Sequence, residues 1–335
     1  MVTMKIAVDG FGGDYAPLAV LQGCEMAVKE YDVQIMLCGD ETQLKRLAQE
    51  NQVSLKGIEI VPANGVIDVE DDPKLILKEK ADCSMGVALR LVAEGKAEAF
   101  VSAGSTAAIV LGASFIVKRI KGIKRAALAP IIPHEKGNYM LLDAGANIEC
   151  RPEMLVQFGI MGSVYVNKIM NVDKPKVGLV NIGAEETKGG ELQLGAYELL
   201  KKAPINFIGN VEPRDIPLGA CDVVVADGFT GNVVLKLTEG MGKFIAHSLK
   251  DIFLNGIKSK LAAVLVLGRV NALKKKMDYT EHGGAALMGV RRPVIKAHGS
   301  SNAVAFKNAI RQAVRFTEQH VIEEIERSLE LNEQQ

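Results

Sequence analysis

Six short runs of aliphatic residues, each followed by a loop of small and polar residues, constrain the fold of this chain most. The loops are Asp9–Asp14, Ser102–Thr106, Asp143–Asn147, Asn181–Gly190, Asp227–Asn232 and Lys296–Asn302. A strand buried in a parallel sheet is an aliphatic run, and open α/β sheets bind ligands at the carboxyl ends of their strands. Glycine lets a backbone approach a ligand closely, and the amides at a helix start attract anions. The pattern therefore predicts an anion-binding surface at one edge of a sheet.

Strand-like and helix-like patterns alternate along most of the chain. Helices are expected over residues 17–29, 42–50, 84–94, 107–120, 152–170, 233–249 and 303–316, with short aliphatic strands among them. Such alternation is typical of a mostly parallel sheet with helices on both faces, which is a three-layer α/β/α fold. Since no linker interrupts the pattern, we expect a single domain over residues 1–335; a second lobe beginning near residue 150 is the alternative.

The segment from about residue 245 to 280 departs from this alternation. It lacks a strand followed by a polar loop, and basic residues surround its apolar run Leu261–Leu267. These basic residues are Lys250, Lys258, Lys260, Arg269, Lys274, Lys275 and Lys276. We expect a projecting amphipathic helical hairpin that either packs on another subunit or lies on anionic lipid, and the two alternatives are compatible.

The composition argues against several classes of protein. Lys and Arg together number 40, as do Asp and Glu, so the chain lacks the basic excess of a general nucleic-acid binder. The five Cys residues lack metal-ligand spacing, which favours buried thiols in a reducing cytosol. The sequence shows neither a signal-peptide pattern nor an apolar run of about 18 residues, so we expect a cytoplasmic location.

The first loop contains part of a dinucleotide-binding fingerprint. Gly10, Gly12 and Gly13 follow a strand, but Tyr15 stands where the third glycine of that fingerprint would be. The chain also lacks a nucleotide P-loop, a nucleophile elbow and a cluster of Cys and His residues. We therefore expect no nicotinamide cofactor and no metal ion.

The last loop carries the most suggestive chemistry. A cation, an imidazole, a glycine and two hydroxyl groups lie close together in it, at Lys296, His298, Gly299, Ser300 and Ser301. Such groups suit a phosphate at the start of a helix. The alternative is that one of the two serines simply caps the helix that follows.

Two further loops are candidates for anion binding. Glycines flank Phe229 and Thr230 in the fifth loop, which favours close approach of a ligand; the alternative is helix capping by Thr230 or Asn232. In the fourth loop Lys188 precedes two glycines and could hold an anion, unless it is a solvated surface lysine.

Motifs spread along the chain resemble those of a known family. They are Ala7–Asp9, Gly12–Asp14, Ser102–Gly104, Leu142–Asn147, Gly209–Asp215, Asp227–Val233, Gly283–Ala285 and Val294–Ser301. In this order they are similar to the bacterial acyl-ACP:phosphate acyltransferases, the PlsX family, over essentially the whole chain. The chain departs from the usual family pattern at several positions, among them Tyr15, Ser105 and Glu186.

The resemblance implies that inorganic phosphate and a fatty acyl-acyl carrier protein form an acyl phosphate for phospholipid synthesis. It also implies a cytosolic homodimer at the membrane surface, with a membrane glycerol-3-phosphate acyltransferase as a further partner. The implied fold is similar to isocitrate and isopropylmalate dehydrogenases and to phosphotransacetylases. Neither a cofactor nor a nucleic acid is implied.

The candidate site follows from the chemistry of this reaction. Phosphate is already an anionic nucleophile and a thiolate leaves readily, so positioning and oxyanion stabilisation matter most. We expect direct attack of phosphate on the thioester, with His298, Asn232 and Lys188 as catalytic residues. The substrate-binding candidates are Asp14, Ser102, Gly104, Ser105, Thr106, Asp143, Asn147, Asp227, Thr230, Gly231, Lys296, Gly299, Ser300 and Ser301. Carboxylates among them are expected to orient donors, because they would repel phosphate.

Three alternative functions stay open at this point. They are a phosphate acetyltransferase-like enzyme that uses acyl-CoA, a metal- and NAD-dependent decarboxylating dehydrogenase of similar fold, and a non-enzymatic scaffold at the membrane. An acidic carrier protein would dock on basic residues. The basic residues expected to bind either the carrier protein or lipid head groups are Lys258, Lys260, Arg269 and residues 274–276.

Overall fold

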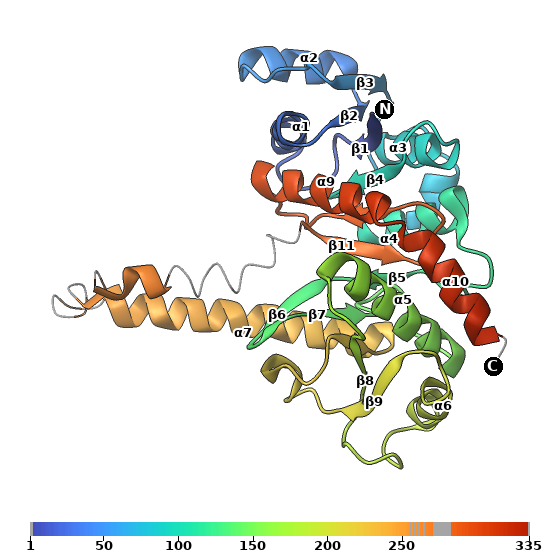
Figure 1. Ribbon diagram of the computed structural model, residues 1–335. Coiled ribbons are helices and arrows are strands. Elements are labelled where there is room, and N and C mark those ends of the chain that lie inside the picture. Colours follow the sequence, from blue (N-terminus) through green and yellow to red (C-terminus); the bar gives the residue numbers. More distant parts are fainter. Residues whose placement is uncertain are drawn as a thin grey trace.

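The described residues form two β-sheets with helices packed around them (Figure 1). The computed structural model describes residues 3–254, 256, 259, 262–263, 265–270 and 283–333. The seven-stranded sheet has the order β3-β2-β1-β4-β12-β11-β5, and β11 is antiparallel to both of its neighbours. Its strands are β1 (Met4–Asp9), β2 (Val33–Gly39), β3 (Ile58–Pro62), β4 (Ala99–Ser102), β5 (Ala127–Ala129), β11 (Ala285–Met288) and β12 (Val294–Lys296).

The second sheet has five strands in the order β6-β7-β10-β8-β9, and β6 runs antiparallel to β7. Its strands are β6 (Ile131–His134), β7 (Gly137–Leu142), β8 (Lys176–Val180), β9 (Asn206–Val211) and β10 (Val223–Val225). Parallel pairs dominate both sheets, so the expected mostly parallel α/β fold is confirmed. The number of domains stays a prediction; the second sheet begins at Ile131, ahead of the position near 150 considered for a second lobe.

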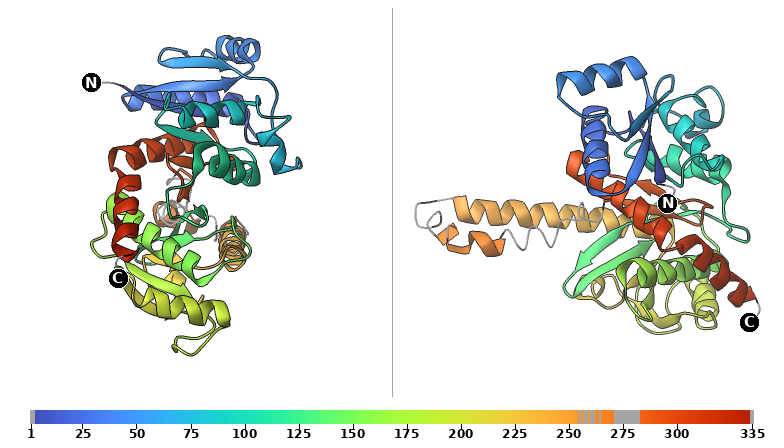
Figure 2. Two further views of the ribbon diagram at one scale, coloured as in Figure 1. Left: turned by 90° about the vertical axis from the view of Figure 1, so that its right-hand side faces the viewer. Right: turned by 45° about the horizontal axis from the view of Figure 1, so that its top comes forward.

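Helices lie on both faces of the sheets (Figures 1 and 2). The α-helices are α1 (Leu18–Glu30), α2 (Glu41–Glu50), α3 (Ser84–Ala93), α4 (Thr106–Gly112), α5 (Pro152–Met170), α6 (Glu191–Leu200), α7 (Gly228–Leu254), α9 (Ala303–Glu318) and α10 (Val321–Glu333). Successive residues of a strand point to opposite faces. In β1, Ile6 and Val8 accordingly join the buried cluster that contains α1 and α9, whereas Ala7 joins the cluster that contains α3.

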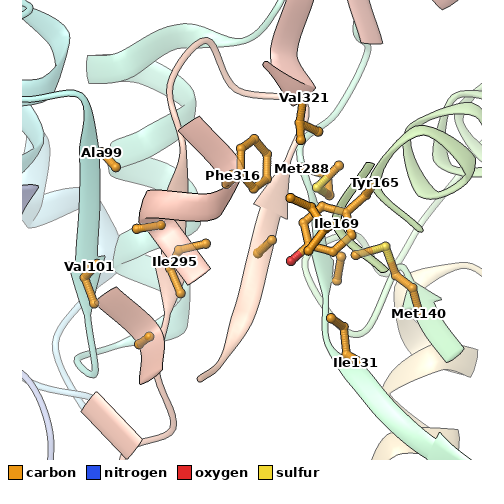
Figure 3. Close-up of a cluster of buried hydrophobic side chains, with 14 of the residues drawn as sticks. Ala99, Val101, Ile131, Met140, Tyr165, Ile169, Met288, Ile295, Phe316 and Val321 are labelled. Carbon is orange, nitrogen blue, oxygen red and sulfur yellow. The ribbon is translucent and has the colours of Figure 1, made fainter. Parts of the chain in front are cut away.

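One cluster of buried side chains connects the two sheets (Figure 3). Val101 and Ile295 come from the first sheet and Met140 from the second, and side chains of α5 and α9 lie among them. The rings of Tyr165 and Phe316 are 5.6 Å apart between centroids in a tilted arrangement, which suits an aromatic pair. This shared core fixes the sheets relative to each other and thereby positions the ends of their strands.

Most helix boundaries lie close to those expected from the sequence. Helix α5 has the predicted ends, with Pro152 in its first turn and Asn171 in a left-handed conformation at its C-cap. The helix expected over 107–120 begins at Thr106 and changes at Ala113 to a π-helix that ends at Lys118. Pro73 begins a short 3₁₀ helix that ends at Leu77.

Helix α7 runs unbroken from Gly228 to Leu254 and projects from the body of the molecule (Figures 1 and 2). Residues 262–263 and 265–270 are also helical and lie beside its outer part. The expected projecting helical segment therefore begins as the outer half of α7. Lys258, Lys260, residues 274–276 and part of the run Leu261–Leu267 lie outside the described residues. None of the helices among the described residues is long and apolar enough to cross a membrane.

Candidate active site

A cavity of about 1840 Å³ lies at the carboxyl ends of strands from both sheets. The loops after β1, β4, β7 and β12 line its polar end, together with the first turns of α7. The predicted site residues in its lining are Asp14, Gly104, Ser105, Thr106, Asn232, Lys296, His298 and Gly299. Five of the six predicted loops thus contribute to one cavity, and the loop after β8 does not.

The buried carboxylate of Asp9 connects two of these loops. It accepts hydrogen bonds from Ser84 Oγ at 2.6 Å and from Ser102 Oγ at 2.7 Å. Ser102 Oγ in turn accepts from the amide of Gly104 at 2.9 Å. Burial raises the pKa of Asp9, and the hydrogen bonds from the two serines oppose that shift. Ser102 therefore lies behind the cavity lining and holds the loop after β4 in place.

The loops after β1, β4 and β12 approach each other through their backbones. A Cβ atom on Gly12 would lie 2.6 Å from the amide nitrogen of Gly104, which is too close for any side chain. The amide of Asp14 donates to the carbonyl of Gly299 at 2.8 Å. Glycine is therefore required at position 12, and backbone groups form much of this wall.

Lys296 extends from the end of β12 along the same wall. Its Nζ donates to the carbonyl oxygens of Ala103 at 3.2 Å and of Ala297 at 2.5 Å. Burial lowers the pKa of Lys296 to about 8, while the charges of Asp14 and Asp9 oppose the shift. The ammonium group is therefore held in a defined position and is mostly protonated at neutral pH.

His298 is oriented by Ser300. Its Nδ1 lies 2.8 Å from Ser300 Oγ and accepts from the Ser300 amide at 3.2 Å. With Nδ1 as an acceptor, the neutral ring carries its proton on Nε2. Partial burial lowers the pKa of His298, and the charge of Lys296 lowers it further. His298 is therefore suited to act at the cavity as a neutral hydrogen-bond donor.

Helix α9 is capped by Asn302, whose side chain accepts from the Ala305 amide at 2.9 Å. The alternative that Ser300 or Ser301 caps this helix is therefore wrong. Ser301 is buried, and its amide donates to the carbonyl of His298 at 3.0 Å. Neither serine lines the cavity, so their contact with a substrate stays a prediction.

The fully buried carboxylate of Asp143 shapes the loop after β7. It accepts from the amides of Leu128 and of residues 145–147, and from the side chain of Asn147, at distances between 2.7 and 3.2 Å. Burial raises the pKa of Asp143, and these hydrogen bonds oppose the shift. Asp143 and Asn147 are absent from the cavity lining, but they position Gly145, which belongs to it.

The start of α7 is fixed by Asp227. Its carboxylate accepts from the Thr230 amide at 2.9 Å and from Thr230 Oγ1 at 2.7 Å. Asp227 is therefore the capping residue, and the alternative of capping by Thr230 or Asn232 is wrong. The hydroxyl of Thr230 points to this carboxylate, whereas Asn232 lines the cavity.

A close contact of two loops brings Asn232 to the cavity. A Cβ atom on Gly231 would lie 1.9 Å from the carbonyl oxygen of Asp143, so glycine is required there. One residue later, the side chain of Asn232 lies against Gly145, at 3.5 Å from the position of a Cβ atom on that glycine. Gly231 therefore acts by allowing this contact, without lining the cavity itself.

Lys236 and Glu239 of α7 also line the cavity and are not singled out by the sequence motifs; Lys243 and Lys250 line it further along the helix. Lys236 Nζ lies 3.2 Å from Glu239 Oε2. The charge of Lys236 lowers the pKa of both Lys296 and His298, so the three groups share one polar region. The spacing of four residues between Asn232 and Lys236, which puts both on one helix face, is the signal that could have found Lys236.

The structure does not bring Lys188 to the cavity lining. Its Nζ lies 3.9 Å from Glu185 Oε1, and its carbonyl accepts from the side chain of Asn181 at 2.9 Å. It belongs to the loop after β8, which β10 separates from β7. A catalytic role for Lys188 therefore stays a prediction.

Beyond the polar end, apolar side chains line most of the cavity. They come from the loop after β3, from β6, from α7 and from the helical residues beside α7. Among them are Val66, Ile67, Val69, Ile131, Ile132, Pro133, Leu235, Leu249, Phe253, Leu267 and Val270. One cavity thus joins a region rich in hydrogen-bond donors to a long apolar region. Within the described part of the chain, no group of three or more His, Cys, Asp or Glu residues is placed to hold a metal ion.

Comparisons with known proteins agree with the motifs. The model of a family described as fatty acid synthesis protein matches residues 4–324. The phosphate acyltransferase of Clostridium botulinum (strain Loch Maree / Type A3) is 49% identical over 327 residues, which cover 97% of this chain and 98% of that protein. The phosphate acyltransferase of Alkaliphilus oremlandii (strain OhILAs) is 48% identical over 96% of each chain.

Solved structures show the same fold at low sequence identity. A phosphotransacetylase from Streptococcus pyogenes has a TM-score of 0.66 and 18% identity, over 96% of this chain and 94% of that one. The EutD phosphotransacetylase from Staphylococcus aureus has a TM-score of 0.61 and 17% identity over 93% of each chain. The expected similarity to phosphotransacetylases is confirmed. Given the family match and the close relatives, this chain belongs to the PlsX family of fatty acid synthesis proteins.

Proposed function

We propose that this protein is a phosphate acyltransferase that forms an acyl phosphate from inorganic phosphate and a fatty acyl-acyl carrier protein, and thereby supplies phospholipid synthesis. One observation carries the proposal: a single cavity joins the polar groups of Asn232, Lys296 and His298 to a long apolar region. The sequence identity of 48% and 49% to two phosphate acyltransferases agrees with the proposal.

The reaction makes modest demands on the protein. A phosphate oxygen attacks the thioester carbonyl, a C–O bond forms and the C–S bond breaks. The thiolate leaves with the electron pair and takes up a proton from water, which is easy for a thiol with a pKa of about 8.5. Positioning contributes about 7–11 kcal/mol to such a reaction, and one oxyanion donor about 2.7–4 kcal/mol.

The lining of the polar end supplies both effects. Lys296 provides positive charge for phosphate. Neutral His298 donates through Nε2, and Asn232 donates through its side-chain amide, to the oxyanion of the tetrahedral intermediate. The carboxylates of Asp143 and Asp227 are occupied by the loops that they hold, so they do not repel phosphate.

The direct test is incubation of the pure protein with palmitoyl-acyl carrier protein and phosphate, followed by trapping of the acyl phosphate with hydroxylamine. Acyl phosphate should form only when phosphate is present. A parallel reaction with palmitoyl-CoA shows whether the donor must be the carrier protein. Absence of phosphate-dependent thioester loss with either donor contradicts the proposal.

Site variants test the assignment of residues. Asn232→Ala and His298→Ala should each lower turnover by about 10²-fold or more, because each removes an oxyanion donor. Asn206→Ala removes an exposed amide on β9 and should leave turnover unchanged. Turnover of both site variants within a factor of about two of the wild type would rule out these roles. Lys188→Ala, assayed alongside, decides whether the loop after β8 takes part.

Homodimer formation is supported by one face of α7. Phe229, Val233, Leu237, Phe244 and Ile252 form an apolar stripe along this helix, and each is at least half exposed. A stripe of this kind on a projecting helix suits a second copy of the helix. The homodimer is therefore part of the proposed function.

Peripheral contact with the membrane by a cytoplasmic protein is supported by the helical residues beside α7. Leu265 is 87% exposed, and Leu267 and Arg269 are exposed near it. Leu265→Glu should reduce flotation of the protein with vesicles of anionic phospholipid, because it places a charge in the lipid interface. Leu331→Glu, at an exposed apolar position on α10, is the matched control. Undiminished flotation of Leu265→Glu rules this contact out.

A further inference from the structure

Apolar residues that line the cavity continue along α7 as far as Phe253. Phe253 belongs to the outer part of this helix, which projects from the body of the molecule (Figures 1 and 2). We propose that an acyl groove, defined by Leu235, Gly242, Ala246, Leu249 and Phe253, binds the acyl chain of the substrate and places the methyl end of an ordinary fatty acyl chain beside Gly242 and Ala246. This inference rests on the proposed function and adds the path of the acyl chain to it.

The five residues of the acyl groove share one face of α7. Successive members are seven, four, three and four residues apart, which is the repeat of a single helix face. All five line the cavity. The apolar stripe proposed for the dimer is centred on a different face of α7 and shares none of these five residues, although its Leu237 also lines the cavity.

The polarity of α7 changes along the cavity. Its first turns bring Asn232, Lys236 and Glu239 to the polar end. From Gly242 to Phe253 the residues of the acyl groove are apolar, and Lys243 and Lys250 line the cavity beside them. A thioester whose carbonyl lies at the polar end therefore directs its alkyl chain outward, where burial is favourable by about 25 cal/mol per Å² of apolar surface.

Three other segments also line the cavity beside the acyl groove. The loop after β3 contributes Ile67 and Val69, and β6 contributes Ile132. The helical residues beside α7 contribute Leu267 and Val270. Apolar side chains from four parts of the chain thus face one elongated space, which suits a flexible alkyl chain.

The acyl groove is about 27 Å long from Leu235 to Phe253, so it has room for an ordinary fatty acyl chain. Each leaflet of a bilayer holds about half of the ~30 Å hydrocarbon core, so such a chain spans about 15 Å. A helix rises 1.5 Å per residue, so this length corresponds to about ten residues of α7. Counted from Asn232 or Leu235, the methyl end lies at Gly242 to Ala246. These are the two smallest residues of the groove, one turn apart.

The experiment enlarges these two positions and measures kcat/KM for octanoyl-, dodecanoyl- and palmitoyl-acyl carrier protein. Ala246→Phe should lower kcat/KM for the palmitoyl donor by about tenfold or more, because it removes the space for a few methylene groups. The kcat/KM for the octanoyl donor should stay nearly unchanged, because its shorter chain does not reach position 246. Gly242→Leu should act on shorter chains than Ala246→Phe does, because it blocks the groove one turn closer to the polar end.

His247→Phe is the matched control. It adds the same side chain to the next residue of the same helix, on a face that does not line the cavity. It should leave the preference among the three donors unchanged. Circular dichroism and thermal unfolding confirm that each variant is folded. The acyl groove is ruled out if Ala246→Phe lowers kcat/KM equally for all donors or behaves like His247→Phe.

A binding measurement separates this inference from the proposed function. A fluorescent palmitic acid analogue should bind about tenfold more weakly to Ala246→Phe than to His247→Phe. Should the wild type form no acyl phosphate from any donor, the proposed function is wrong, yet this difference in binding still supports the groove. Equal binding by the two variants overturns the groove whatever the activity.

Discussion

Lys236 Nζ lies 3.2 Å from Glu239 Oε2, so the cation that α7 brings to the polar end of the cavity is paired within its own helix. The Lys236 side chain is 62% exposed, and such a pair contributes at most about 1 kcal/mol. A phosphate dianion offers the ammonium group a stronger partner. Glu239 therefore holds Lys236 at the polar end of the cavity.

Lys236→Ala is expected to raise the KM for phosphate by about tenfold, which corresponds to about 1.4 kcal/mol, because it removes a cation from the anion site. The KM for the acyl donor should change little. Lys236→Arg should retain most of the affinity, since it keeps the charge. Initial rates of acyl phosphate formation over a range of phosphate concentrations measure both constants.

Lys243→Ala is the control for this prediction. Lys243 also lines the cavity, but it lies seven residues further along α7, about 10 Å from Lys236 along the axis. Its removal should leave the KM for phosphate unchanged. Equal effects of the two substitutions would mean that only the general charge of the helix matters.

The pH dependence of phosphate binding should report Lys296. Its pKa of about 8 lies below that of an ordinary lysine, so the ammonium is present below pH 8 and is lost as the pH rises above it. We expect the KM for phosphate to be constant near pH 7 and to rise towards tenfold per pH unit above pH 8. Lys296→Arg should flatten this rise, because arginine stays charged. An identical profile in that variant contradicts the role of Lys296.

Asp143→Asn should destabilise the fold. The Asp143 carboxylate accepts several hydrogen bonds from N–H groups, most of them in the loop after β7. In the variant an NH₂ group would replace one of the two acceptor oxygens and would face N–H groups that also donate. We expect a loss of about 1.5–3 kcal/mol in the free energy of unfolding, measured by urea denaturation. Asp222→Asn, where the carboxylate accepts from the Lys176 amide nearer the surface, should cost less. Equal losses would argue against this account of the loop.

Leu237→Glu should convert the proposed homodimer to monomers in sedimentation velocity experiments. The side chain is 65% exposed in the apolar stripe of α7, and a buried carboxylate in a dimer interface is costly. Lys250→Glu changes charge on the cavity side of the same helix and should leave the dimer intact. A monomeric wild type, or a dimeric Leu237→Glu variant, shows that the stripe is not the interface.

The positions of the functional loops could be predicted because each follows an aliphatic run. Ile6–Val8 and Val294–Ile295 are buried strands, and the loops after them meet as the rule for parallel sheets requires. Division of the strands into two sheets could not be predicted in the same way. Strand pairing joins residues far apart in the sequence, and the packing of the two sheets depends on equally distant contacts, such as that of Tyr165 on α5 with Phe316 on α9.

Local ambiguity explains the other differences between prediction and structure. Several residues near each helix start can accept a capping hydrogen bond, and the backbone conformation decides that Asp227 and Asn302 do so. The sequence motifs do not single out Lys236, because a single lysine in an amphipathic helix is usually solvated. The glycines beside Lys188 mark a turn but do not fix the direction of its side chain.

The continuity of α7 has a mechanical consequence. The helix is about 40 Å long, and its first turns carry Asn232 while its last carry Ile252. Because α7 is unbroken, it tilts as a rigid body. A contact that immobilises its outer end therefore also fixes the orientation of the Asn232 side-chain amide near its start. Contacts made by the outer end of α7 and the orientation of Asn232 in the cavity are thus mechanically coupled.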